Sequence, residues 1–259
     1  MDFSYTILIP LIPLAVFLLL GINYKSIKPA VSGWIGSLGL FITLVLSYYT
    51  AYQYFFVVGK VGDIYQTFSE QWRWMTFTET LYIDMGVMID QISVMMLIVV
   101  STISFMVHLY SRGYIKGDPG YTKFFAFLSL FTFSMMGLVL AVNLFQIYIF
   151  WELVGVSSFL LIGYYYTKPS AVAAAKKAFI VTRFADLGFL IGILIIGYYG
   201  GSYDFATLND LEGNVISNWA STSFMGLSVI TWGLILIFMG GAGKSAMFPL
   251  HIWLPDAME

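Results

Sequence analysis

The feature that most constrains this chain is the run of residues 124–167, in which Glu152 is the only charged side chain. The run is 44 residues long. As one α-helix it would reach about 66 Å, twice the thickness of a bilayer's hydrocarbon core. A single crossing cannot hold it, so the run predicts two spanning helices. Asn143, a residue that tolerates turns, is predicted to separate them.

The whole chain shows the same character. It is 59% hydrophobic and only 10% charged, with a mean hydropathy of +0.85. These values exclude a soluble domain and predict an all-α integral membrane protein, a multi-span helical bundle within one transmembrane domain. About seven spans are expected, at residues 5–23, 30–59, 85–110, 124–142, 144–167, 171–199 and 224–258. Gly240, Gly241 and Gly243 predict a broken helix in the seventh.

Basic residues favour one orientation of these spans. Eight of the twelve Lys and Arg residues fall in the first, third and fifth predicted loops. The positive-inside rule therefore places those loops on the cytoplasmic side and the N-terminus outside. Arg183 and Lys244 remain within predicted spans and need a separate explanation.

Several kinds of chemistry are excluded on this chain. It has no cysteine, so it offers no disulfide, thiolate metal site or iron–sulfur ligation, and its two histidines are too far apart in sequence to suggest a haem or zinc site. A net charge of −2 gives no indication of nucleic-acid binding. Redox chemistry, if any, must lie on a partner, and we expect no cofactor or metal on this chain.

Glu152 is predicted to lie near the middle of the membrane. It follows Asn143 by nine residues, roughly 13 Å of helix. A charge at that depth costs about 3 to 15 kcal/mol, depending on the scale, so the carboxyl must be neutralised or paired. No partner of opposite charge lies on its own predicted helix, which favours a functional role in exchanging a proton.

The other buried charges permit two interpretations. Asp186 is predicted at a depth similar to that of Glu152, and Arg183 precedes it by three positions, so the two can pair within one turn. Their pair either takes part in proton transfer or only holds helices together. Lys244, just after the glycine-rich break, either shares a polar interior with His251 or snorkels from a helix end. His108, beside basic residues, is expected at the membrane boundary.

Two stretches carry a family resemblance. "FSMMGLVLAVNLFQIYIFWELVGVSSFLLIGYYYTKPSAVAAAKKAFIVTRFADLGF" and "GGAGKSAMFPLHIWLPDAM" resemble the antiporter-like L subunit, or subunit 5, of proton-pumping NADH:quinone oxidoreductase, respiratory complex I. The large subunit of multisubunit cation/proton antiporters is similar through the same motifs. The resemblance is dense over residues 81–259 and weak before them.

The resemblance implies roles for particular residues. Glu152, in the "WE" pair, and Lys244, in "GKSA", match the family's central proton-transfer pair. The "TR-x-x-D" pattern carries over to Arg183 and Asp186 as the flanking charge pair, and "LH-x-WLP" to His251. It also implies three first spans over residues 1–120, then most of the first of two inverted repeats over residues 121–259. The remainder of the family protein is expected to be absent, which would make this an N-terminal fragment.

The resulting functional hypothesis is a proton-translocating membrane subunit of NADH:quinone oxidoreductase that uses a buried Glu–Lys pair. Its expected partners are protons, the lipid bilayer and other membrane subunits, with flavin, iron–sulfur clusters and quinone on partner subunits. The expected location is the inner (cytoplasmic) membrane of a cell. Two alternatives stay open: a cation/proton antiporter subunit, and a non-catalytic scaffold whose buried charges only fix helix packing.

Overall fold

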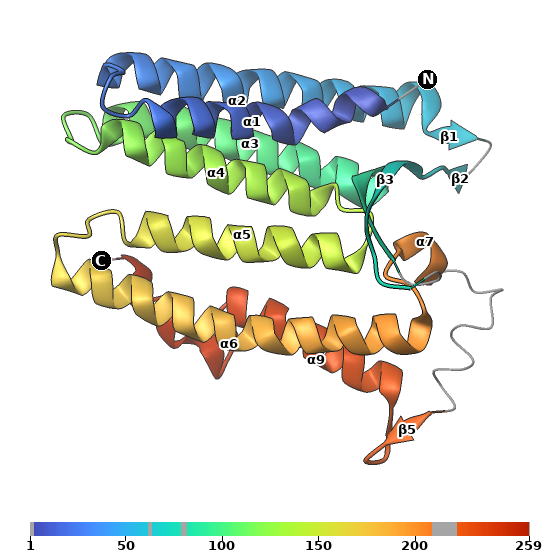
Figure 1. Cartoon of the computed structure of the whole chain (residues 1–259). Helices are drawn as coiled ribbons and strands as arrows, with labels where there is room; N and C mark the ends of the chain where they lie inside the picture. The colour runs from blue at the N-terminus through green and yellow to red at the C-terminus, as the bar shows by residue number, and fades with distance from the viewer. Residues whose placement is uncertain (1–2, 62–63, 79–81, 209–221, 259) are drawn as a thin grey trace. The chain divides into compact units, whose positions relative to one another are not determined.

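The computed structural model describes residues 3–61, 64–78, 82–208 and 222–258. Its described residues include six helices that are long and apolar enough to cross a membrane, together with a shorter apolar one (Figure 1). This confirms the predicted multi-span α-helical fold. The six are α1 (Leu8–Ile22, preceded by the 3-10 turn η1, Ser4–Ile7), α2 (Pro29–Tyr52, extended by the π-helical η2, Gln53–Val58), α3 (Gln91–Tyr114), α4 (Tyr121–Val139), α5 (Leu144–Ile162) and α6 (Pro169–Gly200); the shorter one is α9 (Val229–Lys244).

The chain divides into two compact units. Unit 1 comprises residues 1–70 and 86–141, and unit 2 comprises residues 71–85 and 142–259. The domain boundaries that the resemblance implies stay a prediction.

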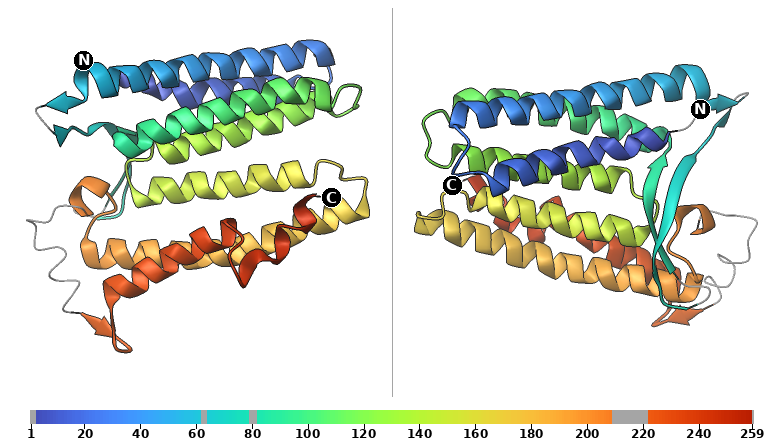
Figure 2. Two further views of the ribbon diagram at one scale, coloured as in Figure 1. Left: turned by 180° about the vertical axis from the view of Figure 1, so that it is seen from behind. Right: turned by 45° about the horizontal axis from the view of Figure 1, so that its top comes forward.

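Unit 1 is built from α1 to α4. α1 packs on α4 and α2, and α3 packs on α2 and α4 (Figures 1 and 2). Close packing depends on small residues of α2. A Cβ atom at Gly36 would lie 2.9 Å from the Phe125 ring, and Gly33 similarly accommodates the side chain of Tyr121. Small residues let helix backbones approach where the surrounding lipid supplies no hydrophobic driving force.

His108 is buried inside unit 1, with 1% of its surface exposed. Nδ1 is 2.8 Å from the carbonyl oxygen of Ser104, and Nε2 is 3.4 Å from Oγ of Ser129. His108 shares the buried face of α3 with Ser101 and Ser111, at helical spacing. Its expected depth at the membrane boundary stays a prediction.

The third span was predicted to begin too early. Before it, the described residues form strands β1 (Lys60–Val61), β2 (Ile64–Tyr65), β3 (Phe68–Thr76) and β4 (Tyr82–Ile89), paired β1 with β2 and β3 with β4. α3 begins only at Gln91, after Asp90, whose side chain accepts a hydrogen bond from the Ser93 amide at 2.7 Å. A short apolar run such as β4 does not distinguish strand from helix by periodicity.

Unit 2 is built around α6, which packs on α5 and, more extensively, on α9 (Figure 2). Gly192 of α6 faces the backbone of α9, where an added Cβ would lie 2.6 Å from the Gly233 carbonyl oxygen. Its shorter elements are α7 (Phe205–Leu208), β5 (Ser223–Phe224), β6 (Leu227–Ser228) and the 3-10 turns η3 (Leu250–Trp253) and η4 (Asp256–Met258).

The predicted break in the seventh span falls slightly later than expected. α9 continues through Gly240, Gly241 and Gly243 and ends at Lys244. Ala246 then adopts a positive φ of 51°, and the chain turns into η3. Gly240 and Gly243 serve close packing against α6 instead: a Cβ at Gly240 would lie 2.7 Å from Cβ of Phe189.

Candidate functional site

The candidate site lies within unit 2, where α5, α6 and α9 meet. Asn143 caps α5, because its side-chain oxygen accepts a hydrogen bond from the Gln146 amide at 2.8 Å. Its side-chain nitrogen also donates to the Asp84 carbonyl at 2.6 Å, which ties the start of the helix to β4. The cap fixes where α5 begins and so where Trp151 and Glu152 fall along it.

Glu152 pairs with Arg183 of α6. The guanidinium Nη1 forms an ion pair with Oε2 of Glu152. Arg183 Nη2 also donates to the backbone carbonyl of Glu152 at 3.0 Å. The two side chains are about a quarter exposed in the chain alone, at 23% and 24%. Each compensates the charge of the other, which satisfies the requirement that charges in a membrane helix be paired.

Asp186 and Lys244 form a second, looser pair. The Asp186 side chain is only 1% exposed, and its Oδ2 lies 3.9 Å from Lys244 Nζ and 4.0 Å from Arg183 Nη1. These separations exceed hydrogen-bond length. Oδ2 is therefore buried without a hydrogen bond from any described residue. A buried carboxylate oxygen without a hydrogen bond is suited to accept a proton, or a hydrogen bond from a water molecule.

Trp151 contacts both members of the second pair. Its indole Nε1 donates to Asp186 Oδ1 at 2.7 Å. Its backbone carbonyl accepts a hydrogen bond from Lys244 Nζ at 2.6 Å, and the same nitrogen lies 5.3 Å from the indole ring centroid. Lys244 is thus held by α5 through a carbonyl and an aromatic face, in addition to the attraction of Asp186.

Gly155 leaves room beside α5 for the side chains of Lys244 and Arg183. A Cβ at this position would lie 2.9 Å from Lys244 Nζ and 3.1 Å from Arg183 Nη2. The carbonyls that the two cations reach belong to Trp151 and Glu152, one helical turn before Gly155. Any larger residue would crowd the approach of the amine and the guanidinium to these carbonyls.

The structure brings together Glu152, Arg183, Asp186 and Lys244, all predicted as site residues. The expected ion pair of Arg183 with Asp186 is present at 4.0 Å. The expected pair of Glu152 with Lys244 is replaced by two others: Glu152 pairs with Arg183, and Lys244 lies 3.9 Å from Asp186. Among the described ion pairs within 4.0 Å, none joins Glu152 to Lys244. The predicted roles of these residues stay predictions.

His251 lies apart from these contacts. It belongs to η3, its side chain is exposed, and its ring packs against Phe248 with centroids 5.7 Å apart. No described hydrogen bond or ion pair links it to Lys244. Nearby, Lys177 of α6 binds Asp256 of η4 at 2.7 Å, which holds the end of the described chain against α6.

Sequence reasoning missed Trp151 and Gly155. Two signals were available in "FWELVG": an indole directly beside the buried carboxylate, and a glycine one turn later inside a helix, where glycine is otherwise unfavourable. Neither signal alone identifies which side chains of other helices would arrive at these positions.

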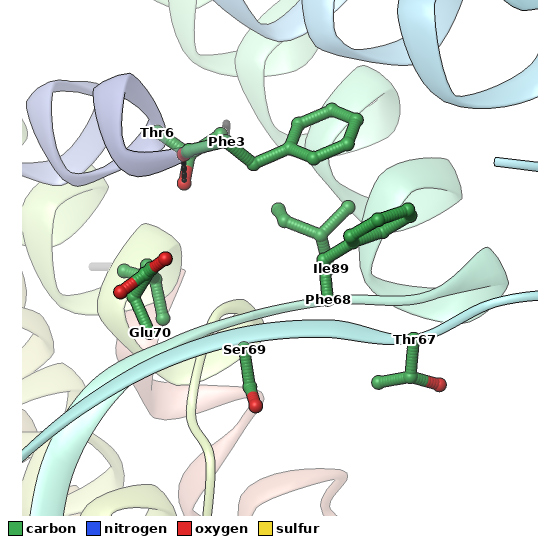
Figure 3. A pocket seen from close by; sticks show the side chains of 8 residues that line it. Phe3, Thr6, Thr67, Phe68, Ser69, Glu70 and Ile89 are labelled. Carbon is green, nitrogen blue, oxygen red and sulfur yellow. Dashed lines mark hydrogen bonds between the residues drawn. The ribbon is translucent and has the colours of Figure 1, made fainter. Parts of the chain in front are cut away.

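Unit 1 holds a pocket of a different kind, with a volume of about 330 Å³ (Figure 3). Phe3, Thr6, Phe68 and Glu70 line it, and the rings of Phe3 and Phe68 lie 4.8 Å apart. Glu70 is its one charged lining residue. It contains none of the predicted site residues, so it does not compete with the charge cluster of unit 2.

Comparison with protein families gives two matches. Residues 141–259 match the family described as NADH:quinone oxidoreductase/Mrp antiporter, TM, and residues 74–125 match NADH-Ubiquinone oxidoreductase (complex I), chain 5 N-terminus. The first match covers the three helices that carry the charge cluster.

Similar curated proteins are named NAD(P)H-quinone oxidoreductase subunit 5, chloroplastic. The protein from Physcomitrium patens is 41% identical over 271 residues, covering 100% of this chain and 35% of that protein. The protein from Chaetosphaeridium globosum is 37% identical over 265 residues, with 100% and 38% covered. The chain thus spans a little over a third of the length of these relatives.

Two solved structures have a similar fold. One belongs to the membrane-bound sulfane sulfur reductase, an archaeal respiratory membrane complex, with a TM-score of 0.76, 18% identity, and 98% of this chain and 47% of that chain covered. The other is the Mrp complex from Dietzia sp. DQ12-45-1b, with a TM-score of 0.75, 22% identity, and 98% and 25% covered. At 18% and 22% identity, these two structures show a shared fold. In sequence, the chain resembles the antiporter-like membrane subunits of NADH:quinone oxidoreductase and Mrp antiporters, through the two family matches and through relatives that are 37% and 41% identical along its whole length.

Proposed function

We propose that this chain is part of a proton-translocating subunit of an NADH:quinone oxidoreductase and that its charge cluster carries the proton. The observation that supports this most strongly is the arrangement of Glu152, Arg183, Asp186 and Lys244, which come from three helices and form three ion pairs. Charged side chains inside membrane helices are costly and mark ion pathways and proton relays. The family matches support the same function.

The transfer step we propose moves a proton from Lys244 Nζ to Oδ2 of Asp186. The atoms lie 3.9 Å apart, so a bridging water or a small side-chain movement completes the connection. The step converts an ammonium and a carboxylate into a neutral amine and a carboxylic acid. At an effective dielectric constant of about 20, an ion pair at this distance is worth roughly 4 kcal/mol, and the step removes that attraction.

The transfer step also affects the ion pair formed by Glu152 and Arg183. Arg183 lies 4.0 Å from Asp186 while it is paired with Glu152. When Asp186 is neutral, Arg183 has only Glu152 as its anionic partner, and when Asp186 is ionised the two carboxylates share one guanidinium. Once its amine is neutral, Lys244 no longer forms an ion pair with Asp186, and the amine can accept a proton from another donor. The cluster therefore couples the charge of one pair to the other.

The electron-transfer groups are proposed to lie on partner subunits. This chain has no cysteine to ligate an iron–sulfur cluster. Flavin, iron–sulfur clusters and quinone therefore remain assigned to other subunits of the same complex. Relatives named as quinone oxidoreductase subunits support such an assembly.

The membrane in which the chain acts is also a proposal. The chain is a multi-pass membrane protein. The sequence predicts the inner membrane of a cell, whereas the similar curated proteins are chloroplastic by name. Those names favour a plastid membrane, and fractionation of the source cells with detection of the full-length subunit decides between the two.

The test of the proposed function is Glu152→Gln in the full-length subunit within its complex. The neutral side chain cannot pair with Arg183 or exchange a proton, so we expect proton translocation to be largely lost while the complex assembles. Glu70→Gln, in the pocket of unit 1, is the matched control and should translocate normally. If assembly fails in step with translocation, the scaffold hypothesis replaces this one.

A cation/proton antiporter subunit is the second candidate, because the matching family and the Dietzia structure both include Mrp proteins. It would use the same charges without a redox partner. Proton flux that requires sodium and continues without quinone reduction would support the antiporter. Flux that requires NADH oxidation and proceeds without sodium would support the oxidoreductase.

A further inference from the structure

Among the hydrogen bonds of the described residues, Trp151 is the one residue of α5 that bonds to both Asp186 and Lys244. The indole N–H binds one carboxylate oxygen of Asp186, and the backbone carbonyl binds the amine of Lys244. The carbonyl contact does not depend on the type of side chain, whereas the indole contact does. Substitution of Trp151 can therefore separate the two contacts.

The indole ring is held firmly in place. It packs edge-on against Phe189 of α6, with ring centroids 5.3 Å apart and planes at 79°. Tyr148 packs on Phe189 in the same manner at 5.8 Å. These rings lie against a buried cluster that also includes Ile193 and Tyr203. Edge-to-face aromatic contacts are directional, so the direction of the N–H is set by packing.

The indole bond distinguishes the two oxygens of Asp186. Oδ1 accepts from Trp151 at 2.7 Å, while Oδ2 has no hydrogen bond and lies closest to Lys244 among the described cations. A carboxyl group without this bond could rotate and present either oxygen to either cation. With the bond in place, the unoccupied oxygen faces the amine that the proposed function treats as the proton donor.

We propose that Trp151 is a positioning residue that fixes the rotation of the Asp186 carboxyl group and so keeps its second oxygen, Oδ2, toward Lys244 and Arg183. This inference rests on the proposed function. It adds a residue whose side chain carries no proton itself but determines which oxygen receives one. It also gives a reason for an aromatic residue with a donor directly before Glu152.

The test is Trp151→Phe in the full-length subunit within its complex. Phenylalanine keeps an aromatic ring against Phe189 and leaves the backbone carbonyl for Lys244, but it removes the indole donor. Charge-assisted hydrogen bonds of this kind support an expected loss of about tenfold in protons translocated per turnover. The matched control is Trp232→Phe in α9, whose indole donates to the Phe224 carbonyl at 2.9 Å outside the cluster; it should stay within about twofold of wild type.

A spectroscopic measurement excludes a merely structural effect. In the complex with isotope-labelled tryptophan, the indole N–H resonance that disappears in Trp151→Phe identifies residue 151. Asp186→Asn should move that resonance, because an amide oxygen is a weaker acceptor than a carboxylate. The Trp232 resonance should stay in place. Subunit content of the purified complex is measured in parallel.

The outcomes separate this inference from the function on which it rests. Normal translocation in Trp151→Phe, or an indole resonance that Asp186→Asn leaves unchanged, overturns the positioning role while Glu152→Gln still tests the relay. If Glu152→Gln translocates normally, the proposed function fails whatever Trp151 does. If the Trp151→Phe complex loses the subunit, Asp186→Asn decides without that assignment: an indole N–H resonance that moves, other than the one absent in Trp232→Phe, supports the positioning role, and unchanged indole resonances overturn it.

Discussion

Buried hydroxyl groups of unit 1 and the charge cluster of unit 2 find their partners in different ways. In unit 1, several hydroxyl groups bond to the carbonyl four residues earlier in their own helix, as in Thr43 to Gly39 at 3.1 Å and Ser129 to Phe125 at 2.8 Å. In unit 2, Arg183 and Lys244 reach carbonyls of a different helix and pair with carboxylates across helices.

This difference distinguishes polar groups that serve only helix packing from charged groups that can take part in proton transfer. A hydroxyl bonded within its own helix satisfies a polar group without specifying a neighbour. Charges that must find partners on other helices fix the arrangement of those helices, and any change in one charge affects the others. We therefore expect substitutions in unit 2 to change proton transfer and comparable substitutions in unit 1 to change stability alone.

The largest expected effect contrasts Lys244→Met with His108→Gln. Methionine removes the amine that donates the proton, so translocation by the full-length complex should fall by at least roughly 100-fold, as for loss of a general acid. His108 is buried and bonded to a backbone carbonyl of its own helix, so His108→Gln should stay within about twofold. A pH-sensitive dye in sealed vesicles measures both. Abolished flux in His108→Gln would remove the distinction between the units.

A smaller effect is expected for Gly155→Ala. The new methyl group would lie 2.9 Å from Lys244 Nζ, the end of a flexible side chain, so the amine should move and the fold should persist. Misplacing a reacting group by about 1 Å can cost up to roughly a hundredfold, and we expect a tenfold loss of translocation or more. Gly241→Ala on α9 is the control, since its Cβ would meet nothing within 4 Å. Equal translocation by Gly155→Ala and Gly241→Ala would show that a methyl group at residue 155 does not hinder the approach of the Lys244 amine to α5.

The spans were predictable from sequence because they depend on length and polarity. The predicted segment 171–199 corresponds to α6 (Pro169–Gly200), and 144–167 to α5 (Leu144–Ile162). Strand β4 was assigned in part to the third span, because an apolar run of strand length beside a spanning helix reads as part of that helix. Strand β3 is polar and exposed, and it fell in a predicted loop. The end of α9 was placed at its glycines, of which Gly240 and Gly243 instead serve contact with α6.

The charged members of the candidate site were predictable, whereas most of their pairing across helices was not. Glu152, Asp186, Arg183 and Lys244 stand out because each is a charge in an apolar segment. Which carboxylate meets which cation depends on helix rotation and separation, and these depend on contacts such as Gly192 against the backbone of α9. The spacing within one helix carries no such information.

A stability effect without loss of function is expected in unit 1. Gly36→Ala would place a methyl group 2.9 Å from the Phe125 ring and 3.4 Å from His108, inside a packed helix interface. Overpacking of this kind costs about 1 to 3 kcal/mol. The melting temperature of the purified complex should fall, while translocation per assembled complex stays unchanged. Gly113→Ala, with open space around its Cβ, should leave both unchanged.

The smallest expected effect concerns Asp204, which follows α6 in unit 2. Burial and the nearby charge of Asp84 raise the pKa of the Asp204 carboxyl above its usual 3.8, with Asn143 and Arg73 partly opposing them. The folded state therefore favours the protonated carboxyl. The stabilisation that this gives is complete below the usual pKa and is lost as the pH rises through the raised value.

Hydrogen exchange measures this local effect. The Leu144 amide donates to the Tyr203 carbonyl at 3.1 Å, and the Phe205 amide to the Val142 carbonyl at 3.4 Å, so both amides report on the segment that holds Asp204. Their protection factors should decrease as the pH rises through this range, by less than about threefold because a partly exposed charge is screened. Asp204→Asn should remove the pH dependence, since an amide does not titrate. Persistence of the dependence in that variant would assign it to another group and would leave Asp204 with a packing role only.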